Sequence, residues 1–173
     1  MLFRSLRAAA STPWAVAADP AKNPLPALIE AARLAGGRDV ANVPALRALL
    51  ARADPAFRWW GAVGLGHLGR GAAAAVPDLA KALGDDSWDV RLAAADALRA
   101  MGRVEDAVPV FREALRHESA LIRLGALNGI DRLGAAAMPF VPDIAAARMT
   151  AKGHVPGYVN RMVEYLPAQI QAR

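Results

Sequence analysis

One dipeptide recurs at an almost constant interval along this chain, and it constrains the fold more than any other feature. Four Val-Pro dipeptides, beginning at Val43, Val76, Val108 and Val141, are spaced by 33, 32 and 33 residues, and a fifth at Val155 lies outside this period. A period of this length is typical of repeat proteins, in which each copy is one supersecondary unit that buries its apolar face only against its neighbours. The sequence therefore predicts four stacked copies.

Each copy has the pattern of two consecutive helices. The first would begin at the valine, with proline just inside its start, where a missing N–H costs no hydrogen bond. Apolar residues follow the valine at i+3, i+6 and i+7, which is the spacing of one helix face. The second helix would carry apolar residues at i, i+4, i+7, i+8 and i+11, in the second copy Val90, Ala94, Ala97, Leu98 and Met101.

Small residues share fixed positions in the second helices. Gly61 and Gly64 stand where the second copy has Ala94 and Ala97, and Gly129 takes the latter position in the third copy. Because glycine and alanine carry little or no side chain, we expect neighbouring helices to approach one another closely at these positions.

The ends of the second helices also recur. Each helix is preceded by a side chain that can accept a hydrogen bond from an orphan N–H, and it is followed by a glycine suited to a left-handed cap. The expected N-caps are Asp54, Ser87 and Ser119, and the expected C-caps are Gly69, Gly102 and Gly134.

The two ends of the array depart from this pattern. A capping helix at residues 23–37, with Asn23 as its N-cap, would cover the first copy. Its expected apolar face consists of Leu25, Leu28, Ile29 and Ala32. In the fourth copy Arg148 replaces an apolar residue of the first helix and Lys152 replaces the cap residue, so we expect this copy to face water.

Composition agrees with a helical fold. Hydrophobic residues make up 55% of the 173 residues and aromatic residues only 6%, and alanine, the strongest helix former, is abundant. We therefore predict an all-α chain, an α-solenoid of about four helix pairs of 32–33 residues with an N-terminal capping helix. It would form a single domain over residues 23–173, with repeats starting near 43, 76, 108 and 141. Residues 1–22 would be a tail or linker without fixed structure.

The sequence lacks the residues that several function classes require. Without cysteine there are no disulfides, thiolate metal sites, iron–sulfur clusters or cysteine nucleophiles. His67, His117 and His154 are too far apart to form a helical metal motif, so we expect no metal and no cofactor. No run of 18 apolar residues occurs, so we expect no membrane span. The compartment stays open between the cytoplasm and export, because the start of the chain only faintly resembles a signal peptide.

The net charge of +5 raises nucleic acid as a partner. Acidic and basic residues alternate, however, and no run of five like charges occurs. A solvated surface of mixed sign explains the charge better than a phosphate-binding face does. We therefore expect no specific nucleic-acid partner.

Three arginines form a column near the start of successive second helices, namely Arg58, Arg91 and Arg123. The column would either bind anions or hold the turns of adjacent copies together, with acids such as Asp86 and Glu118 nearby. The structural interpretation is favoured, because a planar guanidinium forms bidentate pairs that lysine does not form.

Other side chains are candidates for docking a partner. Trp60 would join Trp14 and Val63 in an apolar patch at the N-terminal end, or it would simply pack in the core. The polar sides of the second helices carry further candidates, namely Asp96, Arg99, Asn128, Asp131 and Arg161. Their mixed signs suit a protein or peptide better than a phosphate backbone.

The second copy resembles a HEAT-like repeat of the short bacterial type. The signature of these repeats is Asp/Ser-x-x-Val-Arg-x-x-Ala-x-x-Ala-Leu, and residues 87–98 (SWDVRLAAADAL) match it throughout. Tetratricopeptide and ankyrin units have a similar length, but their signature residues are absent. The resemblance implies a solenoid of helix pairs.

Longer stretches resemble the helical C-terminal region of certain bacterial sulfatases. They include residues 57–65 (FRWWGAVGL), 122–128 (IRLGALN) and 158–161 (YVNR), in the same order. Sulfatases use a formylglycine made within a Cys/Ser-x-Pro-Ser-Arg motif, and no serine here stands in that motif. The resemblance therefore implies an accessory region without its catalytic domain, and no catalytic residue is carried over.

These observations predict a non-catalytic protein-interaction or scaffold module. Its partner would be another protein or a preceding sulfatase-type catalytic domain. The alternatives are a HEAT-like enzyme similar to bilin lyases or alkylpurine DNA glycosylases, and a solenoid that binds nucleic acid weakly. A lyase needs a pocket with aromatic and acidic lining, and a glycosylase needs a Trp/Asp cluster on a uniformly basic face. The few aromatic residues and mixed signs argue against both.

Overall fold

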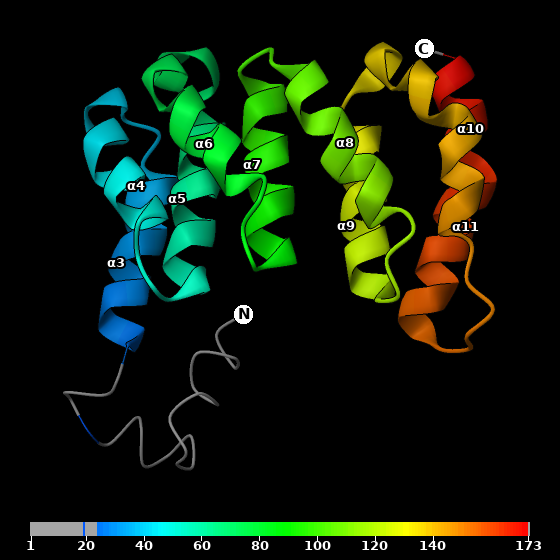
Figure 1. The fold of residues 1–173 in the computed structure, drawn as a ribbon, viewed down its shortest axis with the longest axis horizontal. Coiled ribbons are helices and arrows are strands. Elements are labelled where there is room, and N and C mark those ends of the chain that lie inside the picture. The colour runs from blue at the N-terminus through cyan, green and yellow to red at the C-terminus, as the bar shows by residue number, and fades with distance from the viewer. Residues whose placement is uncertain (1–18, 20–23, 173) are drawn as a thin grey trace. The chain divides into compact units, whose positions relative to one another are not determined.

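The computed structural model describes residue 19 and residues 24–172, and every regular element in these residues is helical (Figure 1). The predicted all-α fold of the α-solenoid class is thereby confirmed. The chain divides into two compact units, with unit 1 ending at Gly102 and unit 2 beginning at Arg103. The predicted tail at residues 1–22 lies outside the described residues apart from Asp19, and a single domain over residues 23–173 stays a prediction.

Unit 1 holds three long helices with two shorter ones between them. The α-helices are α3 (Leu25–Gly36), α4 (Val43–Leu50), α5 (Pro55–Leu68), α6 (Val76–Ala82) and α7 (Trp88–Ala100), and two 3-10 helices cover Val40–Asn42 and Gly69–Ala75. Helix α5 packs against α3 on one side and α7 on the other, and α4 and α6 pack against α5 and α7 (Figure 1). The core between them includes Leu65, Leu79 and Leu98, which have no exposed surface.

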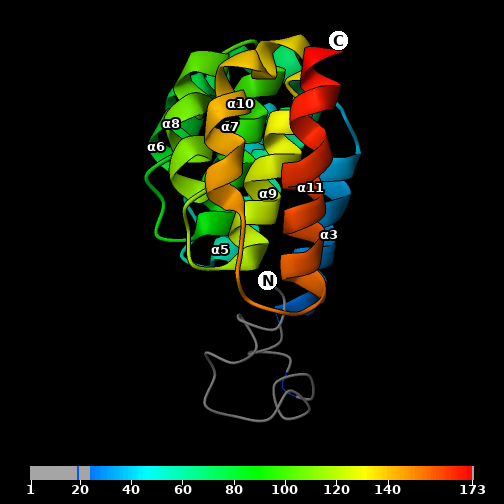
Figure 2. The same cartoon turned by 90° about the vertical axis from the view of Figure 1, so that its right-hand side faces the viewer.

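Unit 2 repeats the pattern, with a short first helix in the fourth copy. Its α-helices are α8 (Val104–Ala114), α9 (Ala120–Asp131), α10 (Val141–Ile144) and α11 (His154–Gln171), and its 3-10 helices cover Gly134–Phe140 and Ala145–Ala147. Helices α9 and α11 lie side by side, with α8 packed on α9 and α10 on α11 (Figure 2). Arg148 is exposed, as expected for the polar substitution in this copy.

Close contacts at the small-residue positions confirm the predicted approach of neighbouring helices. A Cβ added to Gly61 would lie 2.8 Å from the Leu46 carbonyl oxygen, and one added to Gly64 would lie 2.9 Å from the Ala35 Cα. In unit 2 a Cβ at Gly129 would collide with the Phe111 ring. A larger residue at Gly61 or Gly64 would push two helices apart, and one at Gly129 would displace the Phe111 ring.

The three predicted cap glycines all have positive φ angles, although only Gly69 is itself a C-cap: Gly102 follows the C-cap Met101, and Gly134 lies two residues after the C-cap Arg132. Gly69, Gly102 and Gly134 have φ angles of 51°, 83° and 59°. Of the N-cap bonds predicted at Asp54, Ser87 and Ser119, only the one at Asp54 is present. Asp54 accepts a hydrogen bond from the Ala56 N–H at 2.8 Å.

Ser87 and Ser119 occupy N-cap positions without making a side-chain cap bond, so that part of the prediction is wrong. A side chain two residues earlier accepts from the serine's own N–H instead. Asp85 Oδ1 does so at 2.8 Å for Ser87, and His117 Nδ1 at 3.0 Å for Ser119.

The third copy departs from the predicted start of its first helix. Helix α8 begins at Val104, so Pro109 lies inside it rather than in its first turn. The connection from Gly102 to the Val-Pro valine is one residue shorter than in the second and fourth copies. The 3-10 helix found at this place in those copies is replaced by a direct helix start, which the acidic residues Glu105 and Asp106 favour in the first turn.

The apolar face predicted for the capping helix is partly wrong. Leu28 is buried, but Leu25 is 42% and Ile29 60% exposed. The buried positions are Leu28, Ala31 and Ala35, which stand 33 residues before Gly61, Gly64 and Leu68. Helix α3 therefore packs in the register of a second helix, and that register turns Ile29 outward.

Leu98→Ala tests whether burial between neighbouring helices stabilises the fold. Leu98 has no exposed surface, so truncation should lower the free energy of unfolding by about 2–5 kcal/mol. Leu121→Ala is the control, because Leu121 is 66% exposed and should change this free energy by less than about 0.5 kcal/mol. Urea denaturation followed by circular dichroism measures both, and equal effects would contradict the assigned core.

Candidate functional site

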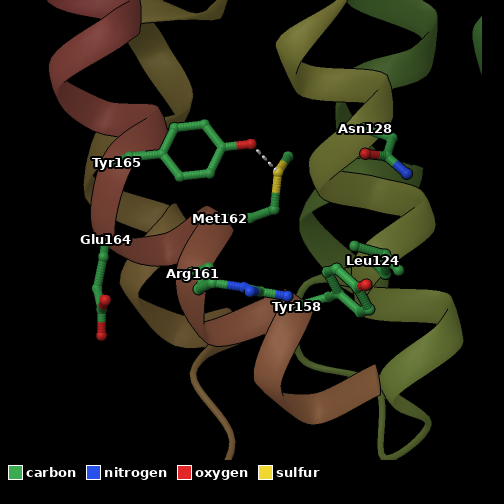
Figure 3. A pocket seen from close by; sticks show the side chains of 7 residues that line it. All are labelled: Leu124, Asn128, Tyr158, Arg161, Met162, Glu164 and Tyr165. Carbon is green, nitrogen blue, oxygen red and sulfur yellow. Dashed lines mark hydrogen bonds between the residues drawn. The ribbon is translucent and has the colours of Figure 1, made fainter. Parts of the chain in front are cut away.

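A groove of about 590 Å³ opens between α9 and α11 in unit 2 (Figure 3). Its lining combines aromatic, apolar, amide and charged side chains. They are Leu124, Asn128, Tyr158, Arg161, Met162, Glu164 and Tyr165.

Helix periodicity explains why these side chains meet. Helix α9 buries Ala126, Leu127, Gly129 and Ile130, so Leu124 and Asn128, one turn apart, remain on its open side. On α11, Tyr158, Arg161 and Tyr165 follow one another at i, i+3 and i+7 and form one helix face. Asn128 and Arg161 are 33 residues apart, which is the repeat length, so they hold equivalent positions on two neighbouring second helices.

The contacts within the groove fix the orientation of its larger side chains. The Arg161 guanidinium lies 4.3 Å from the centre of the Tyr158 ring, a cation–π distance. The Tyr165 hydroxyl donates a hydrogen bond to the Met162 sulfur. Glu164, at the edge of the lining, points away from α9 and lies 3.4 Å from Arg148 (Figure 3). The residues Tyr158 and Tyr165 remain 54% and 44% exposed.

The structure brings two of the predicted docking residues together and leaves the others elsewhere. Asn128 and Arg161 line the groove, whereas Asp131 is the last residue of α9 and is not part of the lining. Asp96 and Arg99 belong to α7 in unit 1, where they form an ion pair at 2.7 Å. Sequence reasoning missed Met162 and Tyr165, although the spacing of Tyr158, Arg161 and Tyr165 on one helix face was a usable signal.

The other predicted docking patch contains half-buried residues. Trp60 packs against both apolar clusters of unit 1, and its ring centre lies 4.7 Å from that of Trp59 at an interplanar angle of 72°. Val63 is also half-buried, and Trp14 lies outside the described residues. The more exposed apolar side chains at this end are Leu25, Ile29 and Val40.

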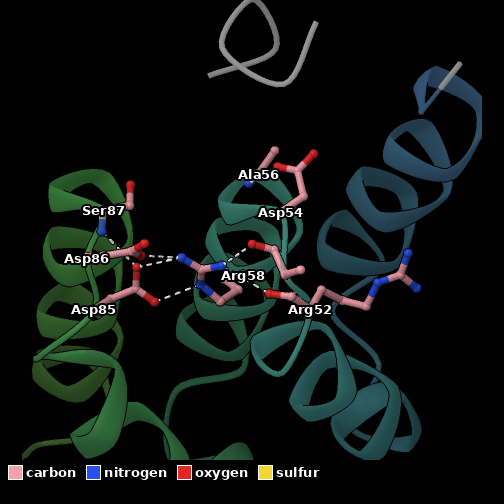
Figure 4. Close-up of polar contacts among 8 residues, drawn as sticks. Arg52, Asp54, Ala56, Arg58, Asp85, Asp86 and Ser87 are labelled. Atoms are coloured by element: carbon pink, nitrogen blue, oxygen red, sulfur yellow. Dashed lines mark hydrogen bonds and ion pairs between the residues drawn. The ribbon is translucent and has the colours of Figure 1, made fainter. Parts of the chain in front are cut away.

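The arginine column is hydrogen-bonded within the helix stack, and Arg58 is the most heavily engaged member (Figure 4). Its Nε and Nη2 donate to the two carboxylate oxygens of Asp85 at 2.7 and 2.8 Å, and Nη2 also donates to Asp86 at 2.6 Å. Its Nη1 donates to the carbonyl oxygens of Arg52 and Ala53 at 3.0 and 2.6 Å. Arg58 thus joins the end of α4 to the turn that precedes α7.

The other two arginines bond chiefly to carbonyl oxygens at the ends of first helices. Arg91 donates to the Leu83 carbonyl at 3.0 Å and lies over the Trp88 ring. Arg123 donates to the His117 carbonyl and to three carbonyl oxygens of residues 146–148. In the fourth copy, where Pro156 takes this position, Asn160 makes two hydrogen bonds to the Met149 backbone at 2.8 and 2.9 Å.

The buried pair at Arg58 changes the acidity of its partner. Burial raises the pKa of Asp85, but the hydrogen bonds from the Arg58 guanidinium and the Ser87 N–H outweigh it, so the pKa lies below its ordinary value of 3.8.

Among the described residues there is no cluster of three or more histidine, aspartate or glutamate side chains that could hold a metal ion. His67, for example, contacts the Ala35 carbonyl through Nδ1 at 3.1 Å.

Comparison with known proteins assigns the chain to a family. The family model for HEAT repeats matches residues 15–99, 43–131 and 76–147, and the chain belongs to this family of helical repeat proteins. No curated protein and no solved structure gives a significant match. Within the described part of the chain no helix is both long and apolar enough to cross a membrane.

Arg58→Gln and Arg47→Gln should differ in their effect on stability. The side chains of Arg58 and Asp85 are 13% and 10% exposed, so losing Arg58 leaves a buried carboxylate and should cost about 2–4 kcal/mol. Arg47 pairs with Asp78 at 2.5 Å, but these side chains are 44% and 37% exposed, so its loss should cost less than about 1 kcal/mol. Urea denaturation of the two variants makes the comparison, and equal costs would refute a special role for Arg58.

The lowered pKa of Asp85 predicts a loss of stability in acid. Because the folded-state pKa lies below the unfolded-state value, the carboxylate stabilises the fold above about pH 4, and this contribution is lost as the pH falls through the folded-state pKa. Asp85→Asn should therefore lower the free energy of unfolding at neutral pH and flatten its fall below about pH 4. Asp78→Asn, in the exposed pair, should retain the wild-type profile. An unchanged profile in Asp85→Asn would contradict the assigned shift.

Proposed function

We propose that this HEAT-repeat chain is a non-catalytic protein-interaction module that binds its partner in the α9–α11 groove. The observation that carries the proposal is the lining of that groove, in which Tyr158, Tyr165, Met162 and Arg161 meet between two second helices. Tyrosine, methionine and arginine are the residue types enriched at protein interfaces, and two exposed tyrosine rings supply contact area at little conformational cost.

The groove suits protein better than nucleic acid. A phosphate backbone is bound by several cationic side chains along one face. In this lining, Arg161 is the only lysine or arginine. The equivalent positions in the four copies are Val63, Asp96, Asn128 and Arg161, which carry different charges. This succession gives no continuous basic stripe of the kind a DNA glycosylase-like or nucleic-acid-binding solenoid would need.

The narrower proposal is that the chain is the C-terminal HEAT region of a sulfatase without its catalytic domain. It rests on the motifs at residues 57–65, 122–128 and 158–161. The partner would then be a sulfatase-type catalytic domain encoded beside this chain. A sulfatase reading frame directly upstream would support this, and a neighbourhood without one would remove the support.

Site-specific photo-crosslinking tests the broader proposal. A benzophenone amino acid at Asn128, in the groove, should crosslink in the source cells to one defined protein. The same group at Glu113, exposed on α8, is the control and should give no such adduct. Adducts that are equal at both positions would refute the groove as the binding surface. An adduct at Asn128 that nuclease removes would favour the nucleic-acid alternative.

A further inference from the structure

On the side of the α9–α11 groove that faces α9, the positive charge of Arg161 is not neutralised by an acidic side chain of the lining. Arg161 has no hydrogen bond or ion pair to an acidic side chain among the residues that the structure describes, and its guanidinium is oriented by the Tyr158 ring at 4.3 Å. The one acid in the lining, Glu164, points away from α9 (Figure 3) and lies 3.4 Å from Arg148. The open face of the groove is therefore positive.

The open space around Arg161 extends toward the start of α11. A second hollow of about 500 Å³ is lined by Gly153, His154, Gly157 and Arg161, so the two hollows share the arginine. No acidic side chain belongs to this lining. A Cβ added to Gly157 would meet nothing within 4 Å, so the space above this turn of α11 is open. The N-terminal end of a helix also favours negative charge.

The opposite end of the groove is apolar. Leu124, Met162 and the Tyr165 ring line it, and Met162 is 8% exposed. Because the Tyr165 hydroxyl is bonded to the Met162 sulfur, the polar end of this tyrosine is turned inward. An apolar side chain can therefore lie against the ring and the thioether without removing water from a free hydroxyl.

Asn128 supplies a donor and an acceptor between these two ends. It is exposed on α9, at the repeat position equivalent to that of Arg161 on α11. A side-chain amide can bond to both the N–H and the carbonyl of one peptide unit. This is a contact that an extended chain offers and a folded helix does not, because the backbone groups of a helix are already paired.

We propose that the groove binds a short extended segment of its partner in which an acidic residue alternates with apolar ones. The carboxylate would lie on Arg161, an apolar side chain on Met162 and Tyr165, and the backbone on Asn128. The lining runs from His154 to Tyr165, which spans about 16 Å of helix and accommodates about five extended residues. This inference rests on the proposed function, since it names the chemistry of the partner at the same groove.

Three labelled peptides of the form Leu-X-Leu-X-Leu, with X as Glu, Gln or Lys, test the charge preference. Their termini are blocked so that X alone sets the charge. By fluorescence anisotropy with the full chain at low salt, the Glu peptide should bind about fivefold tighter than the Gln peptide, and the Lys peptide should bind weakest. Added salt should reduce the difference between Glu and Gln.

Variants show whether Arg161 is the source of the preference. Arg161→Gln should equalise the Glu and Gln peptides, and Arg161→Lys should keep part of the difference. Arg116→Gln removes the same charge from the first-helix side of unit 2, where Arg116 pairs with Asp143, and should keep the full preference. Circular dichroism confirms that each variant is folded.

The outcomes separate this inference from the proposed function. Equal binding of the Glu and Gln peptides by the wild-type chain, no binding of any peptide, or an undiminished preference in Arg161→Gln would overturn the inference. If a protein still crosslinks at Asn128 in that case, the proposed function stands and only the chemistry of the partner is wrong. Loss of both the crosslink and peptide binding would remove the groove as a protein site altogether.

Discussion

No helix pair of this chain can bury its apolar face alone, and the rest of the structure depends on burial between neighbours. Leu65 on α5 and Leu98 on α7 have no exposed surface, and burying each contributes about 1.5–3 kcal/mol. Much of the remaining core is alanine, which supplies little apolar area per residue. Alanine side chains are buried against a neighbouring helix only if the two helices lie close together. Gly61 and Gly64 permit this approach, because even a Cβ at either position would reach the backbone of a neighbouring helix. The small-residue positions are therefore as important to the stack as the large ones.

Short first helices create a second requirement, which the arginine column meets. Helix α6 has seven residues and α10 four, and helices of this length are unstable by themselves. Their last carbonyl oxygens lack partners within the helix. Arg58, Arg91 and Arg123 each donate to carbonyl oxygens at the end of a first helix or in the turn that follows it. A cation at a helix C-terminus also interacts favourably with the helix dipole. An arginine on the second helix thus stabilises the end of a first helix, which explains its recurrence at one repeat position.

Features that recur at the same position in several copies could be predicted from the sequence, whereas features of a single copy were missed. The helix pairs, the close approach at Gly61 and the left-handed glycines all follow from positions shared between copies. The early start of α8 follows from one missing residue before Val108, and only comparison of the connection lengths would have revealed it. The N-cap bonds predicted at Ser87 and Ser119 are absent, because a serine at the right position does not show in which direction its hydroxyl points. The groove was only half predicted, because Asn128 and Arg161 were chosen for polarity, whereas Tyr165 and Met162 look like ordinary core residues.

The groove follows from the way a repeat protein divides its positions between folding and binding. The positions of Leu65, Leu98 and Ile130 must stay apolar in every copy, since each of these side chains is fully buried. The position shared by Asn128 and Arg161 faces outward and is free to change from copy to copy. The same holds for the position of Tyr158, which is Gly125 in the preceding copy. Such positions line the groove beside Arg161 while the buried column remains intact. Substitutions at such outward positions can therefore alter what the chain binds without altering how it folds.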